Sequence, residues 1–288
     1  MDETLQADLR RAAEALDAAD ALVIGAGAGM GVDSGLPDFR GAEGFWKAYP
    51  PYAQLGLNFY ELANPRWFRH DPLLAWGFYG HRLNLYRAAR PHAGFAILRR
   101  WGEAMAHGAR VVTSNVDGQF QRAGFDPDHI VEVHGAIDWM QCTGDCGIRT
   151  FPADPYEVVV DEATMRAATP LPRCPACGAL ARPNILMFGD FDWNGDRTDA
   201  QERRFALWAT SFPRDPAVRL VVVECGAGMA VPSVRNACES LARRFDGTLI
   251  RINLREPEVP RGQIGLPSGA LAALAAIDAL RGQGADRS

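Results

Sequence analysis

The sequence predicts an α/β fold built on a doubly wound parallel sheet, and three observations support this prediction. Residues 21–24 form a continuous apolar run, and residues 109–113 and 218–223 are mainly apolar without a strict alternation, as in strands that are covered on both faces. Turns and helical patterns separate these runs at intervals, which favours parallel strands joined by helices. The first run ends in a glycine-rich turn, the place where Rossmann-like folds receive the pyrophosphate of a dinucleotide.

The glycine-rich turn is the most informative stretch of the chain. Gly25, Gly27, Gly29 and Gly31 lack Cβ atoms, so backbone N–H groups can approach an anionic ligand closely. Such turns also occur without a ligand. Residues 35–41, however, add an acid, an aromatic ring and a guanidinium directly beyond the turn. This combination favours a dinucleotide site.

Composition limits the classes of protein that fit. The chain has 288 residues, 48% of them hydrophobic, and a net charge of −5. It can therefore bury a large core, and its charge gives no electrostatic reason to expect nucleic acid or an anionic membrane as a partner. The sequence has no long apolar run and no basic, apolar export signal. We expect a cytoplasmic monomer.

Four of the six cysteines form two close pairs. Cys142 and Cys146 make the first pair, and Cys174 and Cys177 the second. Each pair can place two thiolates on one side of a tight turn, and together they supply the four soft ligands that a structural zinc ion prefers. Unrelated thiols or a disulfide are the alternatives, but a chain without an export signal favours metal. We expect one structural zinc ion.

The remaining elements follow from spacing and composition. Apolar residues at helical intervals predict helices over 3–19 and 269–281, and buried runs predict strands at 130–133 and 248–252. The aromatic residues between 44 and 100 favour a small helical module that buries its own rings. We expect three parts: a Rossmann-like domain of residues 1–43, 101–135 and 186–288, a helical module of residues 44–100, and a zinc-binding module of residues 136–185.

A series of motifs in this order resembles the sirtuins, the NAD-dependent protein lysine deacylases. The motifs are Gly27-Ala28-Gly29-Met30, Ser34-Gly35-Leu36-Pro37-Asp38-Phe39-Arg40-Gly41, Asn115-Val116-Asp117, His134-Gly135, the cysteine pairs, Phe188-Gly189-Asp190, Gly226-Ala227-Gly228 and Ile252-Asn253. The resemblance covers roughly residues 15–280. It implies NAD as co-substrate, a structural zinc ion, and acyl-lysine-bearing proteins as partners.

The resemblance also implies which residues bind NAD. They are Gly27, Ala28, Gly29, Met30, Asp38, Phe39, Arg40, Ser114, Asn115, Val116, Asp117, Gly226, Ala227, Gly228 and Asn253. Among them, Asp38 and Arg40 would orient the nicotinamide, and Phe39 would shield the reacting ribose carbon. Asn115 would contact the nicotinamide ribose and Asp117 the carboxamide, although both residues are also common in ordinary Asx turns.

His134 is the general base that the resemblance implies, with Asn115 and Asp117 as the other catalytic residues. A lone histidine is more often a packed or surface residue, but His134 follows a predicted strand in the matching motif. An imidazole titrates near neutral pH and can accept a proton from a ribose hydroxyl. In the implied mechanism, the acyl oxygen attacks the ribose carbon as nicotinamide leaves, and O-acyl-ADP-ribose and free lysine are released.

Two segments are candidates for substrate binding. Tyr79 and Arg82 are three residues apart and share a helix face, and they match the Tyr-x-x-Arg of sirtuins that accept succinyl and malonyl groups. The alternative is a surface arginine beside a core tyrosine. Phe188, Gly189 and Asp190 match the segment that pairs with the substrate backbone, although an ordinary strand exit is the alternative.

The match has departures on the NAD side. Gly31 replaces a usual serine, Ser114 replaces a usual glutamine, and Gly226-Ala227-Gly228 replaces Gly-Thr-Ser. Each change removes a side chain that could hydrogen-bond the cofactor. NAD hydrolysis or ADP-ribosyl transfer on the same fold is therefore a second hypothesis. A non-catalytic sensor of NAD or ADP-ribose is a third, which the presence of His134 disfavours.

Overall fold

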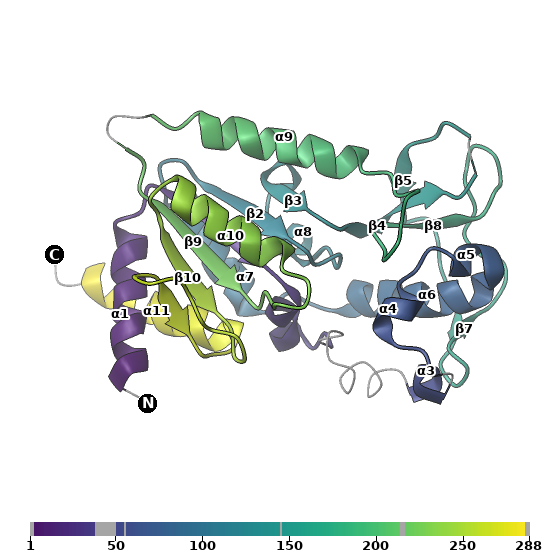
Figure 1. Cartoon of the computed structure of the whole chain (residues 1–288), viewed down its shortest axis with the longest axis horizontal. Coiled ribbons are helices and arrows are strands. Elements are labelled where there is room, and N and C mark those ends of the chain that lie inside the picture. The colour runs from purple at the N-terminus through teal and green to yellow at the C-terminus, as the bar shows by residue number, and fades with distance from the viewer. Residues whose placement is uncertain (1–2, 38–49, 55, 145, 214–216, 286–288) are drawn as a thin grey trace.

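The protein consists of two lobes that lie side by side. The computed structural model describes residues 3–37, 50–54, 56–144, 146–213 and 217–285. One lobe is built on a six-stranded sheet and the other on helices and a smaller sheet (Figure 1). Within these residues, no helix has the length and apolar character that crossing a bilayer requires.

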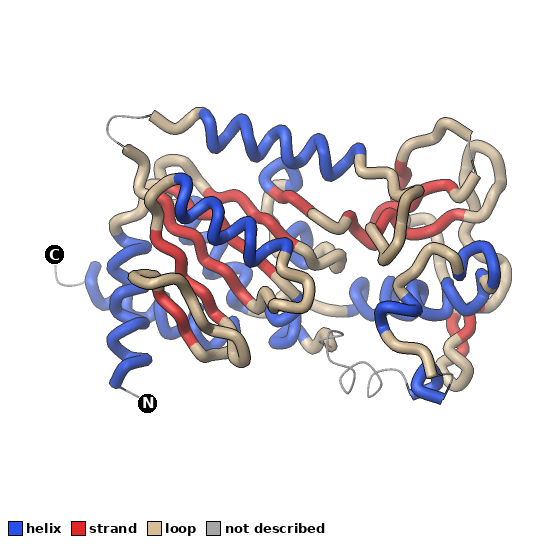
Figure 2. Tube along the Cα trace, in the orientation of Figure 1, coloured by secondary structure: helices blue, strands red, loops and turns tan. Residues whose placement is uncertain are grey.

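The large sheet is parallel throughout. Its strands are β1 (Ala21–Ala26), β2 (Ala109–Thr113), β3 (Ile130–Glu132), β9 (Leu220–Cys225), β10 (Thr248–Ile252) and β11 (Ile264–Leu266). Their order is β11-β10-β9-β1-β2-β3, and every pairing is parallel (Figure 2). The chain therefore winds outward in opposite directions from β1 and from β9. In such a sheet, ligands bind beyond the carboxyl ends of the strands where the order reverses.

Helices cover both faces of this sheet. Helices α1 (Glu3–Asp17), α7 (Ala93–Glu103) and α11 (Ala270–Ala285) share one apolar cluster with the sheet. Helices α9 (Asp196–Thr210) and α10 (Ser233–Arg244) contribute to the cluster on the other face. The doubly wound fold class is thereby confirmed. The first helix ends two residues earlier than the spacing predicted, and α9, α10 and β11 were not predicted.

The second lobe combines two segments that are separated in the chain. It contains α3 (Pro50–Gln54), α4 (Phe59–Leu62), α5 (Trp67–His70), α6 (Pro72–Ala88), a sheet of β5 (Thr150–Pro152), β4 (Gly135–Cys142) and β8 (Ala181–Ile185), and the hairpin β6 (Val160–Asp161) and β7 (Arg166–Ala167). Trp76 and Phe78 from α6 belong to the same apolar cluster as Ile137 and Met140 from β4. The helical and cysteine-bearing segments therefore share one core.

Helix α7 differs from the other helices within residues 44–100. Its buried residues Phe95, Leu98 and Trp101 pack in the core of the large sheet, not with α3–α6. Three short elements complete the fold: η1 (Ala28–Ser34) after β1, α8 (Gln119–Arg122) after β2, and η2 (Pro127–His129) before β3.

A buried ion network ties β9 and β10 to α10. Glu224 and Arg251 lie side by side on neighbouring strands, with less than 2% of either side chain exposed, and Arg251 Nε donates to Glu224 Oε1 at 2.6 Å. Arg251 also pairs with Glu239 of α10 at 2.9 Å. Because both partners are removed from water, each charge needs the other.

We predict that Arg251→Met lowers the free energy of unfolding by about 3–5 kcal/mol, because it leaves Glu224 buried without its cation. Urea denaturation followed by circular dichroism measures this change. The control is Glu103→Gln, which removes an exposed ion pair with Arg99 and should cost less than about 0.5 kcal/mol. Equal effects of the two substitutions would contradict a structural role for the network.

Candidate active site

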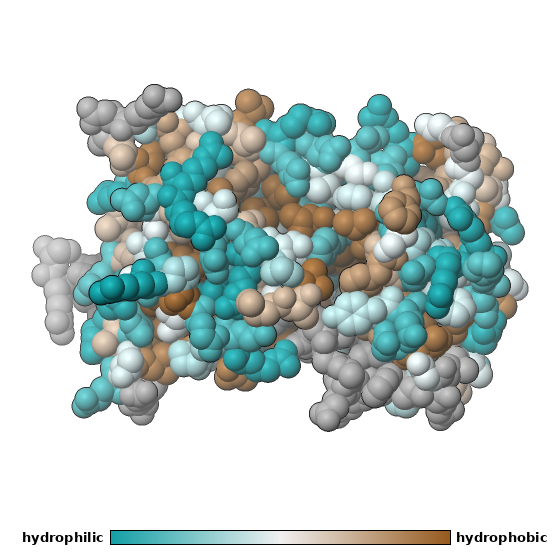
Figure 3. Space-filling model, in the orientation of Figure 1, coloured by the Kyte–Doolittle hydropathy of each residue, from teal (hydrophilic) through white to brown (hydrophobic). Residues whose placement is uncertain are grey.

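Two cavities meet at the glycine-rich turn. The first, of about 470 Å³, lies between the lobes and is called the interlobe cavity here. The second, of about 610 Å³, lies beyond the carboxyl ends of β9 and β10 and is called the sheet-end cavity. Ala28 lines both cavities. In Figure 3, apolar surface lies at the centre of this face, between the lobes.

The structure divides the predicted site residues between these cavities. The interlobe cavity is lined by Ala28, Tyr79, Arg82, Ser114, Asn115, Val116, Asp117, His134, Phe188, Gly189 and Asp190. The sheet-end cavity is lined by Ala28, Gly29, Gly226, Gly228 and Asn253. Gly27, Met30 and Ala227 are not among the lining residues of either cavity. Asp38, Phe39 and Arg40 lie outside the described residues.

The turns after β1 and β9 touch each other. A Cβ atom on Gly27 would lie 2.6 Å from Ala227 Cα, and one on Gly29 would lie 2.7 Å from Gly226 Cα. Gly226 itself has a φ of +63°, in the left-handed region that favours glycine. The N–H of Gly29 donates to the Gly226 carbonyl at 3.1 Å. These glycines therefore set the distance between the two turns.

The loop after β2 is fastened to the first glycine turn. Asn115 Nδ2 donates to the Gly27 carbonyl at 2.9 Å, and the Asn115 N–H donates to Thr113 Oγ1 at 3.0 Å. Asp117 is buried, and its Oδ1 accepts from the N–H of Gln119 at 3.0 Å. Burial raises the pKa of the Asp117 carboxyl to about 6. Asn115 and Asp117 thus reach the interlobe cavity on a rigid loop.

Arg122 holds the same loop from behind. Its guanidinium donates to the backbone carbonyl of Asp117 and pairs with Asp138 Oδ2 at 3.3 Å. Gly118 has a φ of +66° and lies close to Asp138: a Cβ atom on Gly118 would be 2.3 Å from Asp138 Oδ2. No local pattern in the sequence marks Arg122 or Asp138, because their pairing depends on how α8 packs on β4.

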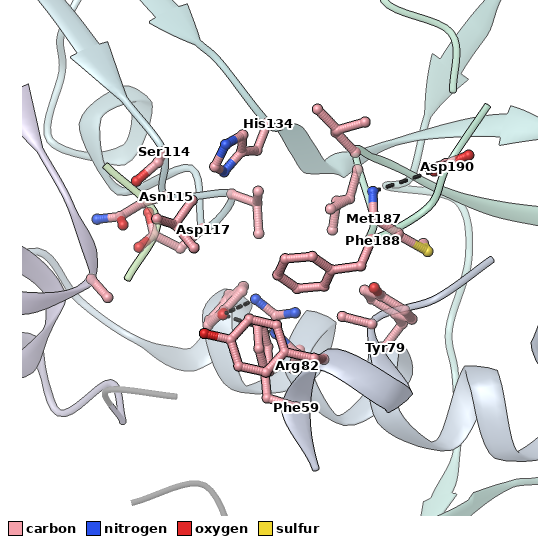
Figure 4. A pocket seen from close by; sticks show the side chains of 18 of the residues that line it. Phe59, Tyr79, Arg82, Ser114, Asn115, Asp117, His134, Met187, Phe188 and Asp190 are labelled. Carbon is pink, nitrogen blue, oxygen red and sulfur yellow. Dashed lines mark hydrogen bonds between the residues drawn. The ribbon is translucent and has the colours of Figure 1, made fainter. Parts of the chain in front are cut away.

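His134 lies between β3 and β4, facing the interlobe cavity (Figure 4). Its carbonyl accepts from the N–H of Leu186 at 2.9 Å, which ties the histidine to the candidate substrate segment. The next residue, Gly135, has a φ of +74°, and a Cβ atom there would lie 2.1 Å from the Asn184 carbonyl oxygen. Ser233 Oγ, at the start of α10, lies 3.5 Å from His134 Nε2. No local pattern in the sequence marks Ser233 as a neighbour of His134.

Helix α6 contributes a polar face to the interlobe cavity. Tyr79 and Arg82 lie on this face as the spacing predicted, and both side chains are buried. Arg82 donates through Nε and Nη2 to the hydroxyl of Tyr86, at 3.0 and 2.8 Å. Tyr86 was missed because aromatic residues in this region were interpreted as core. Its place four residues beyond Arg82, on the same helix face, was the available signal.

The candidate substrate segment, residues 186–190, is a loop rather than a strand. The N–H of Phe188 donates to the Ala63 carbonyl at 2.9 Å, and the Phe188 ring lies between His134 and Arg82 in Figure 4. Asp190 pairs with Arg182 at 2.7 Å, with both side chains buried, and it also accepts from the N–H of Met187. The Asp190 carboxylate thus stabilises the shape of the loop.

The four paired cysteines come together in the second lobe. Their sulfur atoms all lie within 4.8 Å of one another. Cys142 and Cys177 Sγ are 3.6 Å apart, and Cys146 and Cys174 Sγ are 3.7 Å apart. A tetrahedral zinc with sulfur ligands at about 2.3 Å requires sulfur–sulfur separations of about 3.8 Å. The donor set and its spacing therefore fit a structural zinc ion.

The sheet-end cavity has a further support that the sequence did not reveal. Arg235 of α10 is buried and donates to the carbonyls of Glu256 and Glu258 at 3.1 and 2.9 Å. Asn253 Nδ2 donates to the Ala227 carbonyl at 3.0 Å. These hydrogen bonds from Arg235 and Asn253 to backbone carbonyls hold the glycine turn after β9 and the loop after β10 in place.

Fold and site together define a dinucleotide-binding protein of the Rossmann type with an inserted zinc module. Comparison with known proteins makes the assignment more specific. The model of the Sir2 family matches residues 27–199. The chain therefore belongs to the Sir2 family, which the sequence motifs predicted.

Individual relatives agree with this assignment. The chain is 30% identical over 242 residues to NAD-dependent protein deacylase 1 of Caldanaerobacter subterraneus subsp. tengcongensis, covering 82% of this chain and 91% of that protein. It is 32% identical over 228 residues to the NAD-dependent protein deacylase of Thermus thermophilus, covering 76% and 81%. A solved structure of a mutant Sir2 homologue in complex with ADP-ribose is 26% identical, with a TM-score of 0.67 and coverage of 99% and 98%.

We predict that the purified protein contains one zinc ion per chain, bound by the four paired cysteines. Cys177→Ser should lose the metal and lower the melting temperature, because the ion contributes folding free energy. Elemental analysis and a thermal melt measure the two effects. A chelator should reproduce the lower melting temperature, and added zinc should reverse it. Full stability of the metal-free protein would show that the sulfur cluster does not depend on metal.

Proposed function

We propose that this protein is an NAD-dependent protein lysine deacylase that releases nicotinamide and O-acyl-ADP-ribose. The observation that supports this most strongly is the placement of His134, Asn115 and Asp117 around one cavity that adjoins the paired glycine turns. The relatives named above are NAD-dependent protein deacylases. A protein that only bound the dinucleotide would not need an imidazole at this position.

The two cavities suit the two halves of NAD. The sheet-end cavity, with Gly226, Gly228 and Asn253, would take the adenosine half, and the interlobe cavity would take the nicotinamide half. Ala28, between the apposed glycine turns, lines both cavities, so the pyrophosphate would lie at this junction, where glycine-rich backbone lets N–H groups approach an anion. When bound, NAD supplies an electrophilic ribose carbon to the acyl oxygen of the substrate.

The side chains of the interlobe cavity have separate tasks in this proposal. His134 accepts a proton from a ribose hydroxyl, and its tether to Leu186 keeps it beside the substrate segment. Asp117 accepts a hydrogen bond from the carboxamide, and Asn115 orients the nicotinamide ribose. Phe188 and the backbone around Gly189 hold the substrate peptide. Asp38, Phe39 and Arg40 are assigned to NAD from the sequence motif alone.

A second activity, NAD hydrolysis or ADP-ribosyl transfer, is favoured by one specific observation. Gly31 lines the interlobe cavity without a side chain, where the family motif has a serine whose hydroxyl could bond the cofactor. The site therefore has fewer side-chain hydrogen bonds to NAD than the family motif provides, and water could replace the acyl group as acceptor.

We further propose which acyl group the enzyme removes and in which compartment it acts. Tyr79 and Arg82 favour acyl groups that end in a carboxylate, because guanidinium and phenol groups both donate hydrogen bonds to carboxylates. Acetyl-lysine is the simpler alternative substrate. A four-thiolate metal site suits a reducing compartment, so we propose a cytoplasmic enzyme. A monomer that binds neither nucleic acid nor membrane stays our prediction.

The decisive test measures nicotinamide release from NAD by the purified protein, alone and with acetyl-lysine or succinyl-lysine peptides. We expect turnover only with a peptide, and a loss of at least about 100-fold in His134→Ala, because the general base is removed. Liquid chromatography quantifies the nicotinamide. Turnover without peptide would support hydrolysis, and no turnover with NAD still bound would support the sensor hypothesis.

A second prediction concerns pH. Because the pKa of Asp117 is raised to about 6, lowering the pH from 7.5 to 5 protonates the carboxylate and removes its charge-assisted hydrogen bond to the carboxamide. We expect the Kd for NAD, measured by calorimetry, to rise about tenfold over this range, because the fraction of protein with an ionised Asp117 falls by about the same factor.

Asp117→Asn is the matched control for the pH experiment. It should bind NAD more weakly at pH 7.5 and show no step near pH 6, since the amide does not titrate. The variant retains His134 and the other titratable groups of the site. A step in the pH dependence of the Kd that persisted in the variant would therefore belong to a group other than residue 117. That result would contradict the role assigned to Asp117.

A further inference from the structure

The polar face of α6 carries one more donor than the sequence motif contains. Tyr79, Arg82 and Tyr86 all line the interlobe cavity. Their exposed fractions are 1%, 7% and 4%. Three polar groups this deeply buried need hydrogen-bond partners, because an unsatisfied buried donor costs free energy.

Tyr86 has a proton to give. Its hydroxyl accepts two hydrogen bonds, both from the Arg82 guanidinium. Among the residues that the structure describes, no acceptor is found for the hydroxyl's own proton. Burial raises the pKa of Tyr86, so the phenol stays protonated at physiological pH.

Tyr79 likewise has a hydroxyl proton to donate. Its hydroxyl is buried and has no hydrogen-bond partner among the described residues. Burial raises the pKa of this phenol as well. Two phenol donors thus flank one guanidinium in a single cavity, and all three groups prefer an anionic acceptor.

The surroundings of Arg82 confine such an acceptor. The rings of Phe78, Tyr79 and Tyr86 lie with their centroids 5.2–5.7 Å from its guanidinium carbon, and the Phe59 ring lies at 5.9 Å. Apolar side chains such as Ile185, Met187 and Phe188 line other parts of the cavity. This enclosure strengthens any hydrogen bond made inside it.

Among the residues that the structure describes, the other charges that act on this face have partners of their own. Asp190 is neutralised by Arg182 at 2.7 Å, and both charges act on Tyr79. Asp117 faces Tyr86 and Arg82 from the loop after β2, and its Oδ1 accepts from the backbone of Gln119. Within the described part of the chain, an arriving carboxylate therefore meets the donors of Tyr79, Arg82 and Tyr86, whereas Asp190 and Asp117 already have partners.

We infer that Tyr86 is a specificity-determining residue: its hydroxyl fixes the orientation of Arg82 and donates its own proton to the terminal carboxylate of a dicarboxylic acyl group on lysine, beside Tyr79. This inference rests on the proposed deacylase function and adds to it a residue outside the Tyr79-Arg82 pair. Because Tyr86 uses the Nε and Nη2 hydrogens of Arg82, it sets which edge of the guanidinium the substrate meets.

The test compares succinyl-lysine with butyryl-lysine in one peptide sequence. The two acyl chains have the same length and differ in the terminal carboxylate. We expect Tyr86→Phe to lower the succinyl-to-butyryl ratio of kcat/KM by about 10–100-fold, the effect of losing a hydrogen bond to a charged group. Tyr79→Phe should lower the same ratio. Since the Tyr79 hydroxyl has no partner in the part of the chain that the structure describes, this substitution should not lower the melting temperature.

Tyr156→Phe is the matched control. It removes a phenol hydroxyl that donates to the Arg173 carbonyl outside the cavity, and it should leave the ratio unchanged. An equal loss on both peptides in Tyr86→Phe would show a purely structural role and overturn the inference. An unchanged ratio would overturn it as well.

A binding measurement separates this inference from the proposed function. Fluorescence anisotropy with the same two labelled peptides needs no turnover, and the wild-type protein should bind the succinyl peptide at least about tenfold more tightly than Tyr86→Phe does. If no peptide is deacylated but this difference is seen, the proposed reaction fails and the carboxylate site stands. Equal binding of the succinyl peptide by both proteins would refute the role of Tyr86.

Discussion

The close approach of the glycine turns after β1 and β9 is the constraint on which the rest of the site depends. At Gly27 and Gly29, an added Cβ atom would lie less than 3 Å from the backbone of Gly226 or Ala227. Side chains there would separate the two central strands of the sheet at the point where its order reverses. Because the turns touch, Ala28 lines both cavities, and a single extended ligand can occupy them together.

The sequence predicted most of the large sheet because its strands have strong local signals. Residues 109–113 form β2 as expected, β1 is apolar throughout, and β9 and β10 are apolar except for Glu224, Thr248 and Arg251. In contrast, β11 has three residues, too few to show a period. The buried residues of α9 include Thr198 and Gln201, which bond to Glu132 at 2.9 and 3.0 Å. The first half of α9 thus packs through polar contacts, and only its second half, with Phe205 and Trp208, carries apolar residues at helical spacing.

In the candidate site, likewise, some residues are predicted by a local sequence pattern, and the contacts of others depend on the tertiary fold. Cysteine spacing and the shared helix face of Tyr79 and Arg82 are local properties, and the structure brings those side chains together as expected. Whether the hydroxyl of a buried tyrosine such as Tyr86 has an acceptor depends on which groups pack against it in the folded protein. Likewise, the pairing of Asp190 with Arg182 requires the fold of β8 and the loop that follows it. No periodicity in the sequence contains that information.

Electrostatics connect the two halves of the interlobe cavity. Burial opposes ionisation of Asp117, whereas the positive charges of Arg122 and Arg82 favour it. In the proposed function, Arg82 would thus act on the nicotinamide side as well as on the acyl side of the cavity. A substrate carboxylate that neutralises Arg82 removes one of the two charges that stabilise ionised Asp117. Because Arg122 is held by Asp138 behind the loop, away from the acyl pocket, its share of that stabilisation is independent of the substrate. In the proposed reaction, Arg122 would therefore still favour the ionised form of Asp117 when an acidic acyl group is bound.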